Sequence, residues 1–160
     1  MPGYTQVYAF EDERENRNPD VRGLSWDGDT LAAGEIREVA ICNVSVEERK
    51  QMGCAAVDEF AECTTVELDI DVSDDVAEDD PGAFDAEGNV LTEVVWVSYF
   101  ATGGDFESET KLISDAKEGI QGDARRTKWV PPAEAGLYEI WAVARDNRGG
   151  STTIRHTVTI

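Results

Sequence analysis

A single histidine limits the nucleophilic and metal chemistry that this sequence can support. His156 stands in a C-terminal stretch where apolar residues occupy every second position, among them Ile154 and Val158. A Ser-His-Asp or Cys-His site needs its imidazole beside a nucleophile and an orienting carboxylate. A histidine that shares one face of a strand with apolar side chains is instead expected to be a buried or rim residue. We therefore predict a protein without enzymatic activity.

Clustered carboxylates offer a second kind of chemistry, the binding of a calcium ion. The candidate ligands are Asp74, Asp75, Glu78, Asp79 and Asp80. Calcium prefers oxygen ligands, and close carboxylates repel one another until a cation neutralises them. The segment is not an EF-hand, because the position that needs glycine is occupied by Asp74. A solvated acidic loop is the simpler interpretation, and calcium is the one cofactor that we keep as an alternative.

Three cysteines lie in the first half of the chain, at Cys42, Cys54 and Cys63. Their spacing contains no CxxC, and the one histidine is far away, so zinc binding is not indicated. One disulfide among the three, with one free thiol, is typical of an exported protein. Three reduced and partly buried thiols are the alternative.

Four tryptophans could form a platform for carbohydrate: Trp26, Trp96, Trp129 and Trp141. Core packing is the simpler interpretation, and we expect Trp96 to fill the core from the middle of a buried strand. Trp141 differs, because it has the opposite parity from Ile140 in a stretch that is apolar at both parities, so one of the two must face outward or cover an extra strand. An exposed Trp141 would be the best sign of a binding patch.

The charge of the chain excludes two classes of partner. Thirty-four Asp and Glu against fourteen Lys and Arg give a net charge of −20. Nucleic acids and anionic membranes are held mainly by basic side chains, so neither is expected. No apolar run approaches the ~20 residues of a membrane-spanning helix. Nothing before Tyr4 resembles a signal peptide, so we expect either a cytosolic protein or a segment of a longer exported precursor.

Alternating side chains predict an all-β protein. Weaker strand signals lie at 34–44 and 106–112, and the polar segments 73–89 and 115–126 predict loops. The strongest strand signals lie in the ranges 66–72, 93–101, 137–145 and 151–160. In the first range apolar residues alternate with acids, as in a strand with one buried and one solvated face. The second and third are apolar at both parities, which is typical of central strands. The Asn- and Gly-rich segment 146–150 predicts a turn that joins the last two strands as a hairpin.

The chain is longer than a minimal β-sandwich of roughly 100 residues. We expect a tail or linker at residues 1–18 and one domain at residues 19–160. Within the domain, an insertion at about residues 45–63 would form a loop or a short helix that contains Cys54 and Cys63. The pair Ser45 and Glu48 has the spacing of a helix-capping box.

From about residue 66, weakly from residue 18, the chain resembles immunoglobulin-like domains of the PKD and cadherin-like type. The likeness rests on four segments: the strand 94–99 with Trp96, the turn 101–106, the Trp-Val-Pro-Pro…Gly-Leu-Tyr segment 129–138, and the hairpin 143–151. Gly136-x-Tyr138 fits a tyrosine corner, in which the phenol binds backbone near a strand crossing. Two features depart from such domains. Trp96 is followed by Val-Ser-Tyr instead of Asp-Phe-Gly-Asp, and no cysteine lies two residues after Tyr138.

The resemblance implies an immunoglobulin-like antiparallel β-sandwich with an inserted cysteine-containing loop. Such domains recur in bacterial surface proteins and lipoproteins as spacers and adhesive units. The implied function is a non-catalytic structural or adhesion module of an envelope protein, placed outside the cell or in the periplasm. Its expected partners are other domains of the same polypeptide, cell-surface proteins or glycans. A calcium- or carbohydrate-binding module is the alternative function.

Overall fold

The computed structural model describes residues 15–32, 34–42 and 65–160. Apart from one turn of 3-10 helix, Asp123–Arg125, the regular elements of this part of the chain are strands. They are β1 (Val21–Trp26), β2 (Asp29–Thr30), β3 (Ile36–Glu38), β4 (Val66–Val72), β5 (Asp79–Phe84), β6 (Val90–Thr92), β7 (Val95–Ala101), β8 (Asp105–Phe106), β9 (Thr110–Asp115), β10 (Gly119–Ile120), β11 (Thr127–Val130), β12 (Leu137–Asp146) and β13 (Ser151–Thr159). The prediction of an all-β protein is confirmed.

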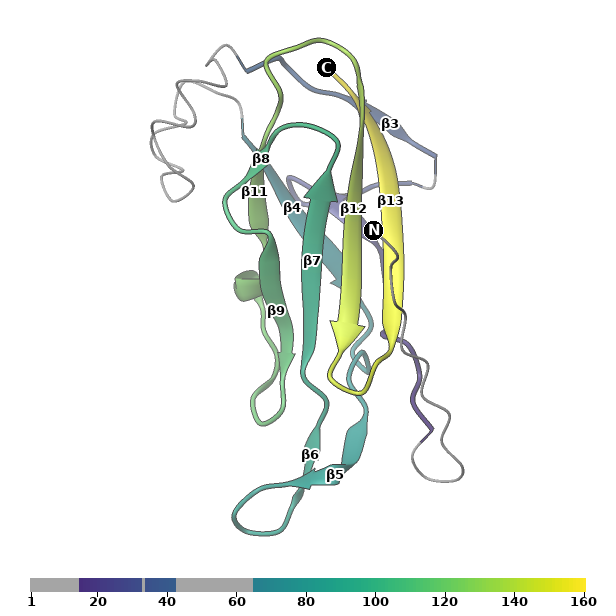
Figure 1. Cartoon of the computed structure of the whole chain (residues 1–160), viewed down its shortest axis with the longest axis vertical. Helices are drawn as coiled ribbons and strands as arrows, with labels where there is room; N and C mark the ends of the chain where they lie inside the picture. The colour runs from purple at the N-terminus through teal and green to yellow at the C-terminus, as the bar shows by residue number, and fades with distance from the viewer. Residues whose placement is uncertain (1–14, 33, 43–64) are drawn as a thin grey trace, which may run out of the picture.

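The described residues form two larger sheets and one small hairpin. A five-stranded sheet has the order β2-β1-β4-β11-β8, a six-stranded sheet has the order β10-β9-β7-β12-β13-β3, and β5 pairs with β6 alone. All pairs are antiparallel except β13 with β3. Figure 1 shows the six-stranded sheet in front of β4 and β11, with the β5–β6 hairpin extending below both sheets. No helix among the described residues has the length and apolar character that a membrane span requires.

The two larger sheets share one apolar core, which makes the fold a β-sandwich. In β4 the apolar residues Val66, Leu68 and Ile70 are at most 2% exposed, and the acids between them face solvent in part. Side chains of β7 and β12 meet them from the other sheet, including Val97 and Ile140. Alternation with period two therefore places one side of each sheet against the other.

Trp96 does not fill the core, contrary to the prediction. In β7 the buried positions are Val95, Val97 and Tyr99, so Trp96 points to the opposite, outer face and is only half-buried. The core tryptophans are Trp129 and Trp26, whose rings meet edge to face with centroids 5.9 Å apart. Both faces of β7 are apolar, so its sequence did not show which parity points inward.

Several loop and strand boundaries also differ from those expected. The segment 73–89, predicted to be a loop, contains β5, and 115–126 contains β10 and the 3-10 turn. The weak strand expected at 106–112 is divided into β8 and β9, which belong to different sheets. Of the strand expected at 34–44, the described residues 34–42 form a strand at β3 alone. The predicted tail up to residue 14, the insertion at 45–63 and its helix lie outside the described residues.

Two of the segments that carry the family resemblance, 101–106 and 129–138, meet at one end of the sandwich. The Tyr138 hydroxyl donates a hydrogen bond to the Glu134 carbonyl oxygen at 3.0 Å, the contact that a tyrosine corner predicts. The Tyr138 ring lies against Gly103, where an added Cβ would stand 2.5 Å from the ring. Trp129 Nε1 donates to the Gly103 carbonyl oxygen at 3.2 Å. At Gly104, which has a φ of +83°, a Cβ would stand 2.4 Å from the Val130 carbonyl oxygen.

Tyr138→Phe is expected to lower the free energy of unfolding by about 1 kcal/mol, because it removes one hydrogen bond and keeps the ring. Tyr138→Leu should cost more, since it also removes the ring that covers Gly103. Urea unfolding of both variants measures the two effects. Equal stability of Tyr138→Phe and the wild type would contradict the corner contact.

Candidate functional site

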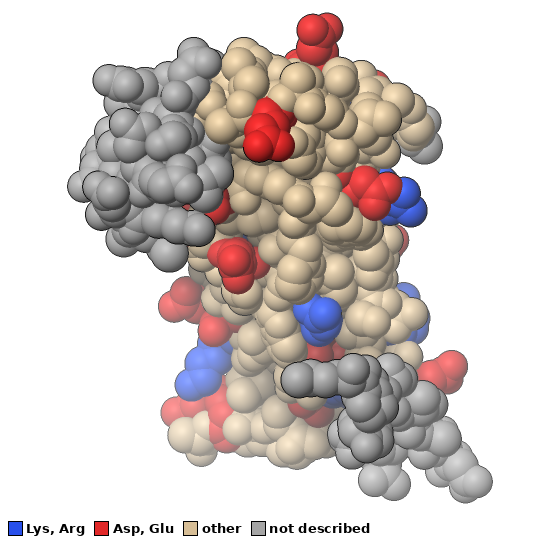
Figure 2. Space-filling view, turned by 45° about the horizontal axis from the view of Figure 1, so that its top comes forward, with Lys and Arg blue, Asp and Glu red and all other residues tan. Residues whose placement is uncertain are grey.

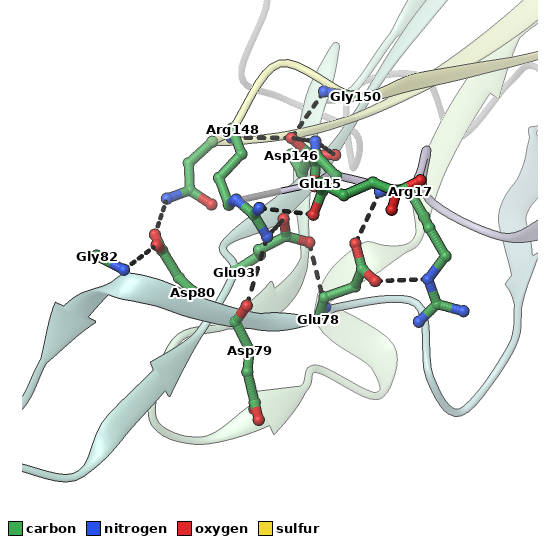
Figure 3. Close-up of polar contacts among 12 residues, drawn as sticks. Glu15, Arg17, Glu78, Asp79, Asp80, Gly82, Glu93, Asp146, Arg148 and Gly150 are labelled. Carbon is green, nitrogen blue, oxygen red and sulfur yellow. Dashed lines mark hydrogen bonds and ion pairs between the residues drawn. The ribbon is translucent and has the colours of Figure 1, made fainter. Parts of the chain in front are cut away.

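The segment predicted to bind calcium is divided between two places in the structure. Asp74 and Asp75 are exposed in the turn after β4. Glu78, Asp79 and Asp80 lie at the start of β5, beside the turn that joins β12 and β13 (Figure 3). The structure therefore brings three of the five predicted ligands into one polar cluster, together with residues that the sequence did not indicate.

An ion pair between Glu93 and Arg148 forms the centre of this cluster. Glu93 is 1% exposed, and its Oε1 lies 3.1 Å from Arg148 Nη1. Its other oxygen accepts a hydrogen bond from the Glu78 backbone N–H at 3.1 Å. The Arg148 guanidinium also donates to the backbone carbonyl oxygens of Asp79, at 3.4 Å, and Glu15, at 2.9 Å. One side chain thus connects three segments of the chain, as Figure 3 shows.

The buried carboxylate of Asp146 organises the turn between β12 and β13. Its Oδ1 accepts hydrogen bonds from the backbone N–H groups of Arg148 and Gly150, both at 2.8 Å. The Asn16 side-chain amide donates to the same carboxylate at 3.2 Å. Residues 15–18 are therefore bound to the domain, although the sequence predicted a tail or linker as far as residue 18.

A second ion pair fixes this N-terminal segment. Arg17 Nε lies 2.5 Å from Glu78 Oε1, and the Arg17 backbone N–H donates to the other carboxylate oxygen at 2.8 Å. Burial alone would raise the pKa of Glu78, but the hydrogen bonds and charge of Arg17 together hold that pKa below its ordinary value. Glu78 is thus an anion whose negative charge is already compensated.

These contacts favour a structural role for the cluster. Guanidinium groups and backbone N–H groups hold Glu78, Glu93 and Asp146. Within the part of the chain that the structure describes, no three His, Cys, Asp or Glu side chains are grouped so as to hold a metal ion. Calcium binding remains a prediction that the contacts do not favour. The sequence did not reveal Arg17, Glu93 and Arg148, because their partners are distant along the chain.

The second candidate site is the outer side of the six-stranded sheet. Trp141 on β12 is half-buried there, directly opposite Phe100 on β7, which is 46% exposed. Trp96 lies four residues before Phe100 on β7, where it pairs with Leu112 on β9 and with Arg145 on β12. The sequence singled out Trp141 as a candidate. It did not reveal Phe100 and Trp96 as neighbours, because strand register depends on pairing and not on local pattern.

Strand register arranges this surface in three rows, which together we call the outer patch. The upper row holds Phe100, Trp141 and Arg155. The middle row holds Thr110, Ser98, Val143 and Thr153. The lower row holds Leu112, Trp96, Arg145 and Ser151. Two rows that carry aromatic rings and an arginine thus flank one row of smaller side chains. Figure 2 shows a view from this side in which the surface is mainly tan, with acidic side chains more numerous than basic ones.

His156 occupies the buried position that its pattern predicts. It is 7% exposed and pairs with Ile140 across β12 and β13. Burial lowers the pKa of its imidazole, and the charge of Glu35 opposes that change only in part. The side chain is therefore expected to be neutral at pH 7 and is directed toward the core.

The cysteine prediction falls mainly outside the described residues. Cys42 is fully buried. Cys54 and Cys63 lie in the range 43–64, which the structure does not describe. The pairing among the three cysteines therefore stays a prediction.

Comparisons of the chain with models of protein families, with curated proteins and with solved structures find no match. The resemblance to immunoglobulin-like domains consequently stays a prediction from the residues.

Proposed function

We propose that this chain is a non-catalytic, immunoglobulin-like module of a bacterial envelope protein that adheres to glycans through its outer patch. Its proposed location is outside the cell or in the periplasm. The observation that carries the proposal is the pair of partly exposed aromatic residues, Trp141 and Phe100, side by side on a solvent-facing sheet. Aromatic side chains gathered on an exposed surface are typical of binding sites.

The order of the strands supports the immunoglobulin-like part of the proposal. Such domains place strands A, B and E in one sheet and strands C, F and G in the other. Here β1, β4 and β11 are consecutive neighbours in one sheet, as are β7, β12 and β13 in the other. Strand β8 takes the place of strand D beside β11, although the two strands that follow it, β9 and β10, belong to the other sheet.

The two faces of β12 support the adhesive part of the proposal. Ile140, Ala142 and Ala144 point inward and are fully buried, so the inward parity already supplies the core. Trp141 and Val143 on the other parity add apolar area that the core does not require. Large apolar side chains placed on a solvent-facing parity are explained by contact with a ligand or partner.

Loss of the two aromatic rings is expected to abolish adhesion. Surface plasmon resonance over bacterial envelope fractions and purified polysaccharides would compare the wild type with Phe100→Ser/Trp141→Ser. We expect retention to fall at least about tenfold, because aromatic anchors dominate binding energy.

The matched control is Phe84→Ser, which removes a ring that is 57% exposed on β5, away from the outer patch. Its retention should equal that of the wild type, and urea unfolding would establish that all variants are folded. Equal retention of the double variant and the wild type would contradict the proposal.

A further inference from the structure

The charge of the outer patch differs from that of the whole chain. Acids make up 34 of the 160 residues and give a net charge of −20. The eleven positions of the outer patch include no acid and two arginines, Arg145 and Arg155. This surface thus offers two positive charges to a carboxylate on a ligand, and Glu139, the ion-pair partner of Arg155, lies at its border.

Both arginines are available to a ligand. The Arg145 side chain makes no hydrogen bond or ion pair among the residues that the structure describes. Arg155 pairs with Glu139, but its side chain is 60% exposed. Exposed ion pairs are weak, so Arg155 can exchange Glu139 for a carboxylate of a ligand at little cost. A guanidinium group binds a carboxylate with two parallel hydrogen bonds.

The aromatic rings define the rest of the ligand. Phe100 and Trp141 present adjacent apolar surfaces, and the C–H bonds on one side of a sugar ring pack well on such surfaces. An extended peptide instead binds a sheet at its edge, where backbone groups are unpaired. The outer patch lies on the face of paired strands and offers no such groups.

The spacing of the rows limits the density of charge on the ligand. The two aromatic rows are four residues apart along β7, which corresponds to about 13 Å. A single sugar ring cannot reach both arginines, so the ligand has several units. A polymer with a carboxylate on every unit would be repelled by the net charge of the protein. Carboxylates separated by neutral sugars would match the two arginines with less repulsion.

We infer that the outer patch binds an acidic polysaccharide in which carboxylate-bearing sugars alternate with neutral sugars. This inference rests on the proposed adhesive function and adds the chemistry of the ligand. It assigns the stacking of sugar rings to Phe100, Trp141 and Trp96, and the recognition of carboxylates to Arg145 and Arg155.

Titration calorimetry with hyaluronan oligosaccharides, in which glucuronate alternates with a neutral sugar, tests the inference. Carboxyl-reduced hyaluronan is the matched ligand, because it keeps the sugar chain and removes the charge. We expect carboxyl reduction of the ligand, or Arg145→Gln/Arg155→Gln in the protein, to weaken binding at least about tenfold. Lys128→Gln, which removes one positive charge from β11 of the other sheet, should leave binding within about twofold.

Three results would overturn the inference. One is equal binding of hyaluronan and its carboxyl-reduced form, which would indicate a neutral glycan. Another is equally tight binding of poly-glutamate through the same arginines, which would indicate an acidic protein. The third is no hyaluronan binding by a protein whose retention on envelope fractions still depends on Phe100 and Trp141. That combination would refute the ligand assignment and leave the adhesive function intact.

Discussion

Trp129→Ala is expected to lower the free energy of unfolding by about 3–5 kcal/mol, the cost of a large cavity in a packed core. Trp129 is fully buried and contacts Trp26 edge to face at an interplanar angle of 68°. Its indole N–H also satisfies the Gly103 carbonyl oxygen in the turn after β7. Alanine removes the ring, the aromatic contact and this hydrogen bond together.

Trp96→Ala is the matched control for Trp129→Ala, because it removes the same side chain from the outer face of β7. We expect a clearly smaller loss of stability, since Trp96 is only half-buried and no cavity forms between the sheets. Urea unfolding with tryptophan fluorescence and circular dichroism gives both values. A larger effect at Trp96 than at Trp129 would reverse the assignment of inner and outer faces.

The sequence was sufficient to predict which face of a strand is buried where apolar and polar residues alternate strictly. In β4, acids separate Val66, Leu68, Ile70 and Val72, so only one parity can be buried, and the structure places it in the core. In β7 both parities are apolar, and the inward side is decided by the partner strands. That is why the strand was located correctly and Trp96 was placed on the wrong face.

Contacts between distant segments were the part that local pattern could not predict. The tyrosine corner joins residues four apart, and the Gly136-x-Tyr138 spacing indicated it. The ion pair of Glu93 with Arg148 joins residues 55 apart. Nothing in the surroundings of either residue identifies the other. The one local indication of the ion pair was that the acid Glu93 begins the predicted strand 93–101, which is apolar at both parities.

Register limited the prediction of the outer patch in the same way. Trp141 was identified because its parity differed from that of Ile140 within one strand. Its neighbours Phe100 and Arg155 belong to two other strands, and they face it only because of the pairing of β12 with β7 and β13. The sequence predicted one candidate residue, and strand pairing places the other residues of the outer patch beside it.

Arg148→Met is expected to lower the free energy of unfolding by about 3–5 kcal/mol at pH 7, the cost of leaving a buried charge without its partner. Methionine keeps much of the length of the side chain but removes the guanidinium from Glu93 Oε1, while the Glu78 backbone N–H still donates to Glu93 Oε2. It also removes the hydrogen bond from the guanidinium to the Glu15 carbonyl oxygen. Arg126→Met should cost much less, because Arg126 forms exposed ion pairs.

The decrease in the free energy of unfolding caused by Arg148→Met should be smaller at acidic pH. Burial and the charge of Asp146 raise the pKa of Glu93 above its ordinary value of 4.5, whereas the charge of Arg148 opposes this shift. Without Arg148 the pKa of Glu93 in the folded state rises further. When folding raises the pKa of a carboxyl, the protein becomes less stable as the pH increases from the unfolded-state pKa to the folded-state pKa of that group. Urea unfolding should therefore show a smaller difference between variant and wild type at pH 5 than at pH 7.5.

Glu93→Gln added to Arg148→Met should remove this pH dependence, because no carboxyl remains to be protonated. An equal loss of stability at both pH values would mean that Arg148 acts through packing and not through the charge of Glu93.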